Sequence, residues 1–473
     1  MSAAEIGLIG LGTMGAMLAL NIADNGFTVA VHNRTAARIP EFLDKAGDLA
    51  DRITGHADIQ DFVQGLATPR NIILMVPAGD AVDAQIDMLR PLLDADDMII
   101  DAGNANFHDS QRRAQAAEDA GVPFLGIGVS GGAEGARFGP SIMGGGTPAA
   151  WDRVAHILKA ISAKYEDQPC ATYMGAGGAG HFVKTVHNGI EYADMQLIAE
   201  AYGVMRDGMG MDAAACGAVF DRWNDGPLQS YLIEISGKVS AATDPETGQP
   251  VLDVILDRAG QKGTGRWTAI EAQMLGAPVP TIEAAVMARN MSAARDLRLS
   301  GSDILGETGR TLDDGALSLE DLEQALIAGK VLCYAQGFDL LSKASADYGW
   351  DLPMAEIAEV WREGCIIRSA MLNDMASALT DAPTRNLALA PFFAGILRDN
   401  LAGLRKVAVV AMGAGHPVPA LAAALNYFDT LTSARTTANM LQAQRDYFGA
   451  HSFERIDRDG AHHGPWLNQH LNG

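Results

Sequence analysis

The stretch Glu5-Ile6-Gly7-Leu8-Ile9-Gly10-Leu11-Gly12-Thr13-Met14-Gly15 decides the fold of the first third of the chain. It begins as an apolar strand and continues as a G-x-G-x-x-G loop that opens a helical pattern over residues 14–25. Gly10 permits a tight turn, Gly12 lets a pyrophosphate approach the backbone, and Gly15 lets the helix pack closely on the strand. The stretch therefore predicts a dinucleotide-binding unit, and a purely structural glycine turn is the alternative.

Short apolar runs alternate with helical stretches through the first third of the chain. The predicted strands cover residues 5–10, 27–32, 71–76, 97–101 and 124–129, with short candidates at 141–143 and 171–174. Strands that barely alternate between apolar and polar residues, separated by helices, are typical of a parallel sheet covered on both faces.

The glycine cluster Gly175-Ala176-Gly177-Gly178-Ala179-Gly180 ends this alternation, and apolar residues then recur at helical spacing. The predicted helices cover residues 181–205, 281–298, 318–346, 354–375 and 390–412. Ser318 and Asp321 form a capping-box pattern at one helix start. The prediction is an α/β Rossmann-like N-terminal domain (residues 1–177), a large all-α domain (178–435) and a C-terminal tail (436–473).

Two helical segments share a W-x-x-G pattern followed by a serine. They are Trp223-Asn224-Asp225-Gly226 and Trp361-Arg362-Glu363-Gly364. The pattern indicates either a duplicated helical unit or a chance match.

Composition excludes several classes of partner. The net charge of −23 disfavours nucleic acid and anionic membranes. No apolar run reaches the roughly 20 residues that span a bilayer, and the N-terminus carries no basic segment that would indicate a secretory signal. Cys170, Cys216, Cys333 and Cys365 are widely spaced, so we expect reduced, buried thiols in a cytoplasmic protein.

The end of the second predicted strand indicates which cofactor binds. NAD sites place an acid there to bond the ribose 2′-hydroxyl, whereas this chain has Val31-His32-Asn33-Arg34-Thr35. The guanidinium of Arg34 can pair with a 2′-phosphate. The segment favours NADP, unless Arg34 is only a solvated residue that begins a helix.

Lys184, His187, Asn188 and Glu191 are spaced i, i+3, i+4, i+7 and share one face of the predicted helix over 181–205. They combine a candidate base, a candidate acid and two hydrogen-bonding groups, which suits acid–base catalysis. The alternative is a solvated polar face with helical side-chain pairs. His187 with Glu191, and His462-His463, lack a third ligand at a convincing spacing, so no metal site is predicted.

The segment Gln261-Lys262-Gly263-Thr264-Gly265-Arg266-Trp267 precedes another helical pattern. A lysine and a threonine among glycines at a helix N-terminus suit an anion such as phosphate. A plain loop explains the composition equally well.

Together these segments resemble the 6-phosphogluconate dehydrogenases. The resemblance runs from the first strand to the tail. The most specific matches are Gly128-Val129-Ser130-Gly131-Gly132 with Glu134-Gly135-Ala136-Arg137, residues 180–196, residues 261–267, Ala288-Arg289, and Arg445-Asp446-Tyr447-Phe448-Gly449 with His451. The family implies oxidative decarboxylation of 6-phosphogluconate to ribulose 5-phosphate in the pentose phosphate pathway, with reduction of NADP.

The resemblance also implies residue roles. Lys184 is the expected general base, and Glu191 the expected acid that protonates the enediol. The implied substrate-binding residues are Asn104, Ser130, Gly131, Gly132, His187, Asn188, Tyr192, Lys262, Thr264, Arg289, Arg445 and His451. The family has Arg445 and His451 reach the partner subunit's site in a homodimer.

The expected cofactor-binding residues are Gly10, Leu11, Gly12, Thr13, Met14, Gly15, Asn33, Arg34, Thr35, Val76, Pro77, Ala78 and Asn104. The chain departs from the family pattern around the cofactor and the substrate loop. Gly12 replaces a usual alanine, Pro77 a frequent lysine, Ala102 and Gly144 a usual glycine and proline, and Ala133 an acid. These departures bear on the preference between NADP and NAD.

Two rival functions remain open. A β-hydroxyacid dehydrogenase for a shorter substrate such as 3-hydroxyisobutyrate would share the first domain and the lysine, but would not need Lys262, Arg289 and Arg445. A catalytically dead NADP-binding sensor would be expected to lose Lys184 or Glu191, and both are present.

Overall fold

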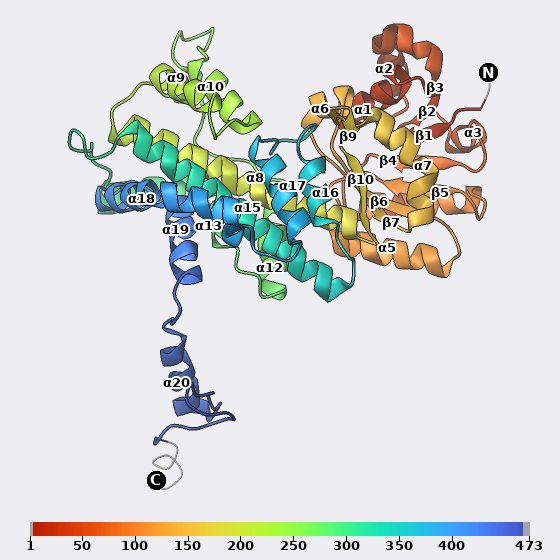
Figure 1. The fold of residues 1–473 in the computed structure, drawn as a ribbon. Coiled ribbons are helices and arrows are strands. Elements are labelled where there is room, and N and C mark those ends of the chain that lie inside the picture. The colour runs from red at the N-terminus through yellow and green to blue at the C-terminus, as the bar shows by residue number, and fades with distance from the viewer. Residues whose placement is uncertain (1–2, 467–473) are drawn as a thin grey trace. The chain divides into compact units, whose positions relative to one another are not determined.

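The computed structural model describes residues 3–466 (Figure 1). The chain divides into two compact units, Met1–Ala424 and Leu425–Gly473. Ten strands lie in the first unit: β1 (Ile6–Ile9), β2 (Val29–His32), β3 (Ile53–His56), β4 (Asn71–Leu74), β5 (Met98–Asp101), β6 (Phe124–Val129), β7 (Ile142–Gly146), β8 (Lys164–Tyr165), β9 (Gln168–Pro169) and β10 (Ala171–Gly175).

Eight strands form one sheet in the order β10-β7-β6-β5-β4-β1-β2-β3, and β8 pairs with β9 in a separate hairpin. The neighbours from β3 to β6 are parallel, as predicted. The prediction of a wholly parallel sheet is wrong at β7, which runs antiparallel to β6. β10 is parallel to β7 and is therefore reversed as well. β3, β8 and β9 were not predicted from the sequence.

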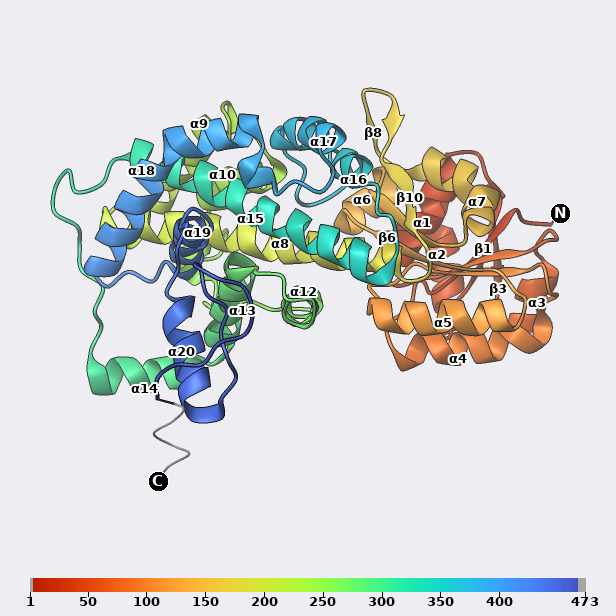
Figure 2. The same cartoon turned by 60° about the horizontal axis from the view of Figure 1, so that its bottom comes forward.

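Helices cover both faces of this sheet, as predicted. Successive side chains of a strand point to opposite faces, and β4 divides accordingly between two apolar clusters. Ile73 belongs to the cluster that holds Leu18 of α1 (Thr13–Asp24) and Trp151 of α7 (Pro148–Ile161). Ile72 belongs to the cluster that holds Val82 of α4 (Asp80–Leu89). Figure 2 shows α1 and α7 on one side of the sheet, with α4 and α5 (Phe107–Asp119) on the other.

Beyond the sheet domain the first unit is helical, α19 crosses into the second unit, and α20 lies within the second unit. The other helices of the sheet domain are α2 (Arg38–Ala46), η1 (Gly47–Arg52), α3 (Ile59–Gln64), η2 (Arg90–Leu92) and α6 (Gly132–Phe138). Those that follow are α8 (Ala179–Gly203), η3 (Val204–Gly208), α9 (Ala213–Asn224), α10 (Tyr231–Ala241), α11 (Val251–Val254), α12 (Thr264–Met274), α13 (Pro280–Ala293), α14 (Arg295–Leu305), α15 (Leu319–Tyr348), α16 (Met354–Val360), α17 (Met371–Asp381), η4 (Leu387–Leu389), α18 (Pro391–Gly413), α19 (Pro419–Leu431) and α20 (Ala438–Gly449).

Three of the five predicted helices match single helices, namely α8, α15 and α18, and the capping box of Ser318 and Asp321 is present. The predicted helix over 281–298 is divided at Ala294, whose backbone is not helical. The side chain of Arg298 donates to the carbonyls of Met291 and Ser292, and so stabilises the exposed end of α13.

The predicted helix over 354–375 is likewise divided, into α16 and α17. The intervening loop is bonded to the sheet domain, because the carbonyl of Gly364 accepts from the N–H of Ser141 at 2.8 Å. Gly364 also has a positive φ of 69°. Contacts distant in sequence therefore override the local helical pattern at this loop.

The two W-x-x-G segments occupy corresponding positions. Each lies at the C-terminal end of the second helix of a set with one long and two short helices, α8-α9-α10 or α15-α16-α17, and Trp223 and Trp361 are both buried. The serines that follow, Ser230 and Ser369, form an antiparallel bridge with each other. The arrangement agrees with a duplicated helical unit.

The second compact unit is organised by one carboxylate. Asp446 on α20 is buried and accepts from the backbone N–H of Ser452 and of Gly464, and from the indole of Trp466. His463 also bonds it, at 2.6 Å. These contacts fold the end of the described tail back onto α20.

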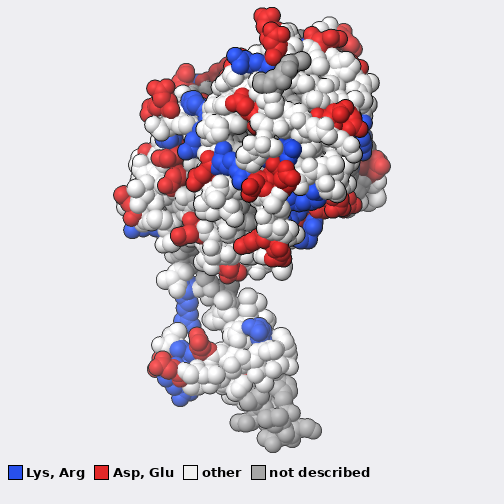
Figure 3. All heavy atoms as spheres, turned by 90° about the vertical axis from the view of Figure 1, so that its right-hand side faces the viewer, with Lys and Arg blue, Asp and Glu red and all other residues white. Residues whose placement is uncertain are grey.

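The four cysteines are free and buried, as predicted. Among residues 3–466, no helix is long and apolar enough to span a bilayer. On the face drawn in Figure 3, basic side chains lie scattered among acidic ones.

Candidate active site

The loop between β1 and α1 is a glycine turn whose outer side is open. Gly10 has a φ of 107°, and a Cβ there would lie 2.4 Å from the carbonyl oxygen of Met75. A Cβ on Gly15 would lie 1.9 Å from the carbonyl oxygen of Gly10, so helix and turn touch. Gly12 immediately precedes α1 as its N-cap residue, and a Cβ there would meet nothing within 4 Å. The turn therefore has an open side at Gly12, and its binding of a phosphate stays a prediction.

A cavity of about 510 Å³ opens beside this turn. The amide oxygen of Asn33 accepts from the N–H of Leu11 at 2.9 Å, which ties the end of β2 to the turn. Of the predicted cofactor residues, those that line the cavity are Gly10, Gly12, Asn33, Arg34, Thr35, Val76 and Pro77. Leu11, Thr13, Met14 and Gly15 belong to the adjoining turn and first helical turn, Ala78 follows Pro77, and Asn104 lies in the loop after β5.

Seven further residues line this cavity and were not predicted, namely Ile9, Arg38, Met75, Ala81, Ala84, Gln85 and Met88. Arg38 begins α2, four residues after Arg34, and both side chains are exposed. A second arginine four residues after the first could have indicated a dianionic ligand, and the prediction did not use this signal. Gln85 and Met88 stand on α4, and no motif marks them.

The polar face of α8 is buried. Lys184, His187 and Asn188 have 6%, 0% and 7% of their surface exposed, which excludes the alternative of a solvated face. The helix can lie this close to β6 because Gly128 has no side chain: a Cβ there would be 2.5 Å from the Cβ of Lys184. The structure thus assigns these polar side chains to an interior site.

Hydrogen bonds join this face to two other segments. The Nζ of Lys184 donates to the hydroxyl of Ser130 at 2.9 Å and lies 3.5 Å from Nδ1 of His187. Nε2 of His187 lies 3.3 Å from the Ser130 hydroxyl. Asn188 donates to the hydroxyl of Thr264 at 2.8 Å, which connects the face to the start of α12.

Burial shifts the protonation of each titratable group on this face. It lowers the pKa of Lys184, and the neighbouring Glu191 carboxylate offsets only part of that effect. It raises the pKa of Glu191, against the opposing charges of Lys184, Arg289 and Lys262. It holds the pKa of His187 well below the ordinary value, and the charge of Lys184 lowers this pKa further. Burial therefore moves Lys184 toward its neutral form and Glu191 toward its protonated form, the directions that suit a base and an acid.

Ser130, Gly131 and Gly132 form the turn between β6 and α6. Gly131 and Gly132 have φ values of 104° and 63°, conformations that favour glycine. A Cβ on Gly131 would also lie 2.5 Å from the carbonyl oxygen of Gly364. The turn is therefore fixed beside Lys184 by the α16–α17 loop.

Cationic groups gather at the other end of the face. The guanidinium of Arg289 lies 3.5 Å above the centre of the Tyr192 ring. A Cβ on Gly265 would lie 2.4 Å from the same ring, so the start of α12 packs against it. Thr264 is buried there, and Lys262 is exposed just before the helix. The glycine-rich segment is thus part of the site, not a separate loop.

Arg445 and His451 lie in the second compact unit, and both are exposed. Arg445 donates to Gln442 within α20. Their participation in the site stays a prediction. Within residues 3–466, no group of three His, Cys, Asp or Glu side chains is placed to hold a metal ion.

The chain matches two family models that together span most of its length. Residues 5–175 match the NAD binding domain of 6-phosphogluconate dehydrogenase, and residues 180–466 match the 6-phosphogluconate dehydrogenase C-terminal domain.

Curated relatives and a solved structure agree with these matches. The NADP-dependent, decarboxylating 6-phosphogluconate dehydrogenase of Bacillus subtilis is 47% identical over 99% of this chain and 100% of its own length. The NAD-dependent, decarboxylating enzyme of the same organism is 45% identical over 98% of this chain and 99% of its own length. The 6-phosphogluconate dehydrogenase structure from Plasmodium falciparum superposes with a TM-score of 0.94, at 41% identity over 98% of this chain and 100% of that one.

Proposed function

This chain belongs to the 6-phosphogluconate dehydrogenase family, and from that premise we propose that it oxidises and decarboxylates 6-phosphogluconate to ribulose 5-phosphate and CO2, with reduction of NADP. The observation that carries the proposal is the buried Lys184, bonded to Ser130 beside His187 and Glu191. A dead binding protein would have no need of this desolvated acid–base group.

The proposed chemistry follows from the two titratable side chains. Neutral Lys184 takes the proton of the substrate 3-hydroxyl as the C3 hydrogen leaves with its electron pair; NADP, when bound, accepts that hydride. The resulting ammonium polarises the 3-keto oxygen, so the C1–C2 bond breaks, CO2 departs and the oxygen takes the proton back. Glu191 then protonates the terminal carbon of the enediol while Lys184 recovers the enol proton.

The same cations that shape this site support a phosphorylated substrate. Arg289 and Lys262 act on Glu191 electrostatically, so they lie close to one end of the reacting face. A substrate as short as 3-hydroxyisobutyrate would leave both without a counter-charge.

The function is tested by incubating the protein with 6-phosphogluconate and NADP while reduced cofactor and CO2 are measured together. Equal amounts of the two products support the proposal. Reduced cofactor without CO2, or turnover of 3-hydroxyisobutyrate alone, would refute it.

We propose NADP as the preferred cofactor because two arginines line the cavity beyond β2 and no acid stands at the end of that strand. Relatives of nearly equal similarity use either cofactor, so overall identity does not decide the preference.

Arg34→Ala is expected to weaken NADP binding and spare NAD. Loss of a charge-assisted bond to the 2′-phosphate costs roughly 1.5–3 kcal/mol, or about 10- to 150-fold in Kd. Titration of both cofactors against wild type and variant measures the difference. Arg112→Ala, an exposed arginine outside the cavity, is the control, and equal losses for NADP and NAD in Arg34→Ala would contradict the assignment.

The pH profile of kcat is expected to be bell-shaped, because kcat includes the later step in which Glu191 donates its proton. Activity rises with pH as Lys184 loses its proton, and because burial lowers its pKa this limb lies below the ordinary lysine value of about 10.4. Activity falls again as Glu191 loses its proton, on a limb above the ordinary glutamate range. Glu191→Gln should remove the alkaline limb and keep the acid limb. An acid limb near 10 would be incompatible with Lys184 as the base.

We propose further that the protein is a cytoplasmic homodimer in which the tail completes the partner's site. Four reduced cysteines support a reducing compartment. The tail helix supports an intermolecular role, because Leu441 and Phe448 of α20 are 62% and 73% exposed, a costly arrangement in water.

A further inference from the structure

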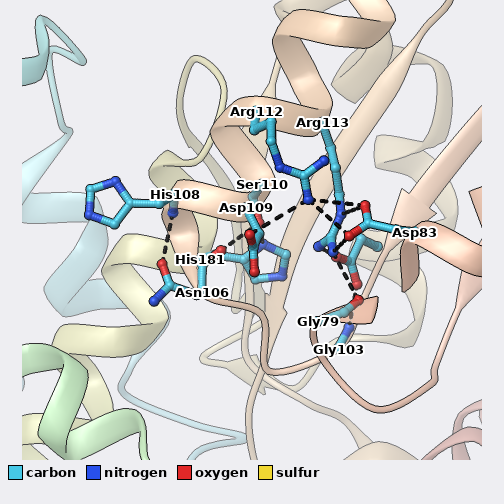
Figure 4. Close-up of polar contacts among 11 residues, drawn as sticks. Gly79, Asp83, Gly103, Asn106, His108, Asp109, Ser110, Arg112, Arg113 and His181 are labelled. Carbon is cyan, nitrogen blue, oxygen red and sulfur yellow. Dashed lines mark hydrogen bonds and ion pairs between the residues drawn. The ribbon is translucent and has the colours of Figure 1, made fainter. Parts of the chain in front are cut away.

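One buried guanidinium bonds three separate segments of the sheet domain. Arg113 on α5 has only 2% of its side chain exposed. Its Nε and Nη2 donate to both carboxylate oxygens of Asp83 on α4, at 2.8 and 3.0 Å. Nη2 also donates to the carbonyl of Gly79 at 3.0 Å, and Nη1 donates to Asp101, at the end of β5, at 3.3 Å. Figure 4 shows Arg113 between Asp83 and Gly79.

These bonds connect the loop after β4, which lines the cofactor cavity, to the loop after β5. Gly79 ends the loop after β4, in which Val76 and Pro77 line the cavity. Asp101 also accepts from the N–H of Gly103 at 3.1 Å, and so shapes the loop after β5 that carries Asn104. The two loops touch, because a Cβ on Gly103 would lie 3.1 Å from the carbonyl oxygen of Val76.

The same face of α5 reaches the catalytic helix. Ser110 lies three residues before Arg113, and its hydroxyl is 2.6 Å from Nδ1 of His181 (Figure 4). His181 is fully enclosed in the first turn of α8, one turn before Lys184. On α5, Arg113 therefore holds the loops after β4 and β5, and Ser110 contacts α8, the helix that carries Lys184.

We propose that Arg113 is a positioning residue for hydride transfer: by fixing residues 76–79 and 102–104 against each other, it sets the distance between nicotinamide and the substrate carbon. This inference rests on the proposed function. The rate of hydride transfer depends steeply on this distance, since a misplacement of about 1 Å costs about 10²-fold in rate. An ammonium in place of the guanidinium cannot make the same bidentate and bridging bonds.

The test compares Arg113→Lys with Arg112→Lys. Arg112 is the matched control, because it stands next to Arg113 on α5 and bonds the same Asp83, but its side chain is 57% exposed and its ion pairs are with Asp83 and Asp109. In Arg113→Lys, kcat should fall about 10- to 100-fold. The isotope effect on kcat with substrate deuterated at C3 should increase, because hydride transfer becomes more rate-limiting. NADP and NAD should be weakened by equal factors, since the 2′-phosphate end is untouched. Arg112→Lys should leave all of these unchanged.

A lower melting temperature with unchanged kcat and isotope effect in Arg113→Lys would overturn the proposal, because a merely stabilising residue behaves in that way. If Arg113→Lys does not fold, Asp101→Asn decides by the same readouts, since it weakens the Arg113 bond but keeps an acceptor for Gly103. If the wild type releases no CO2 from 6-phosphogluconate, the proposed function fails separately. NADPH fluorescence titration of wild type and Arg113→Lys then decides, and equal affinities would refute the positioning role.

Discussion

Lys184→Met is expected to abolish oxidation of 6-phosphogluconate while the protein stays folded and binds NADPH. Methionine keeps the length and apolar stem of lysine but cannot accept the hydroxyl proton, and a general base contributes about 10²–10⁴-fold to the rate. The side chain lies outside the lining of the cofactor cavity, so cofactor affinity should not change. Rapid mixing should reveal no reduced cofactor even in the first turnover.

Glu191→Gln is the informative partner of that variant, because the glutamate acts only after the hydride has left. Its first turnover should yield a burst of reduced cofactor, followed by turnover slowed by about 10²–10⁴-fold. A chelator should not affect the wild-type rate. Activity in Lys184→Met, loss of the burst in Glu191→Gln, or inactivation by chelator would each contradict the metal-free acid–base scheme.

The glycine turn and the strand–helix unit that carries it could be predicted because their signals are local. The turn from Gly10 to Gly15 and the arginine after β2 lie within a single strand–helix–strand unit, whose geometry follows from backbone rules. The reversal of β7 could not be predicted in this way. The direction of β7 depends on which neighbour it pairs with, and its residues have the same apolar, glycine-rich character as a parallel strand.

The catalytic face was predictable from spacing, but its burial was not. The buried Lys184 donates to Ser130, which lies 54 residues earlier in the chain. Asn188 donates to Thr264, which lies 76 residues later. Arg113 illustrates the same limit. Its position beside Arg112 on a polar helix indicates a solvated side chain. Its burial is explained only by Asp83 and Asp101, which the fold brings together from other elements.

Subunit exchange between two inactive variants is expected to restore activity, which is the second large effect. Lys184→Ala and Arg445→Ala dimers should each be nearly inactive when 6-phosphogluconate is present below the wild-type KM. The first lacks the base. The second lacks a phosphate contact worth roughly 1.5–3 kcal/mol, or about 10- to 150-fold in kcat/KM. If Arg445 serves the partner's site, each active centre needs Lys184 from one chain and Arg445 from the other.

Mixing the two variants tests this requirement by complementation. With random exchange under two-fold symmetry, about half of the dimers are mixed, and in each of them one site collects both defects while the other collects neither. Recovered activity should therefore approach about a quarter of wild type. Arg455→Ala is the control within the same unit, because Arg455 makes an exposed pair with Asp457 and should leave the enzyme active alone. If exchange is demonstrated and no activity returns, Arg445 serves its own subunit, because a mixed dimer would then contain no site with both residues intact.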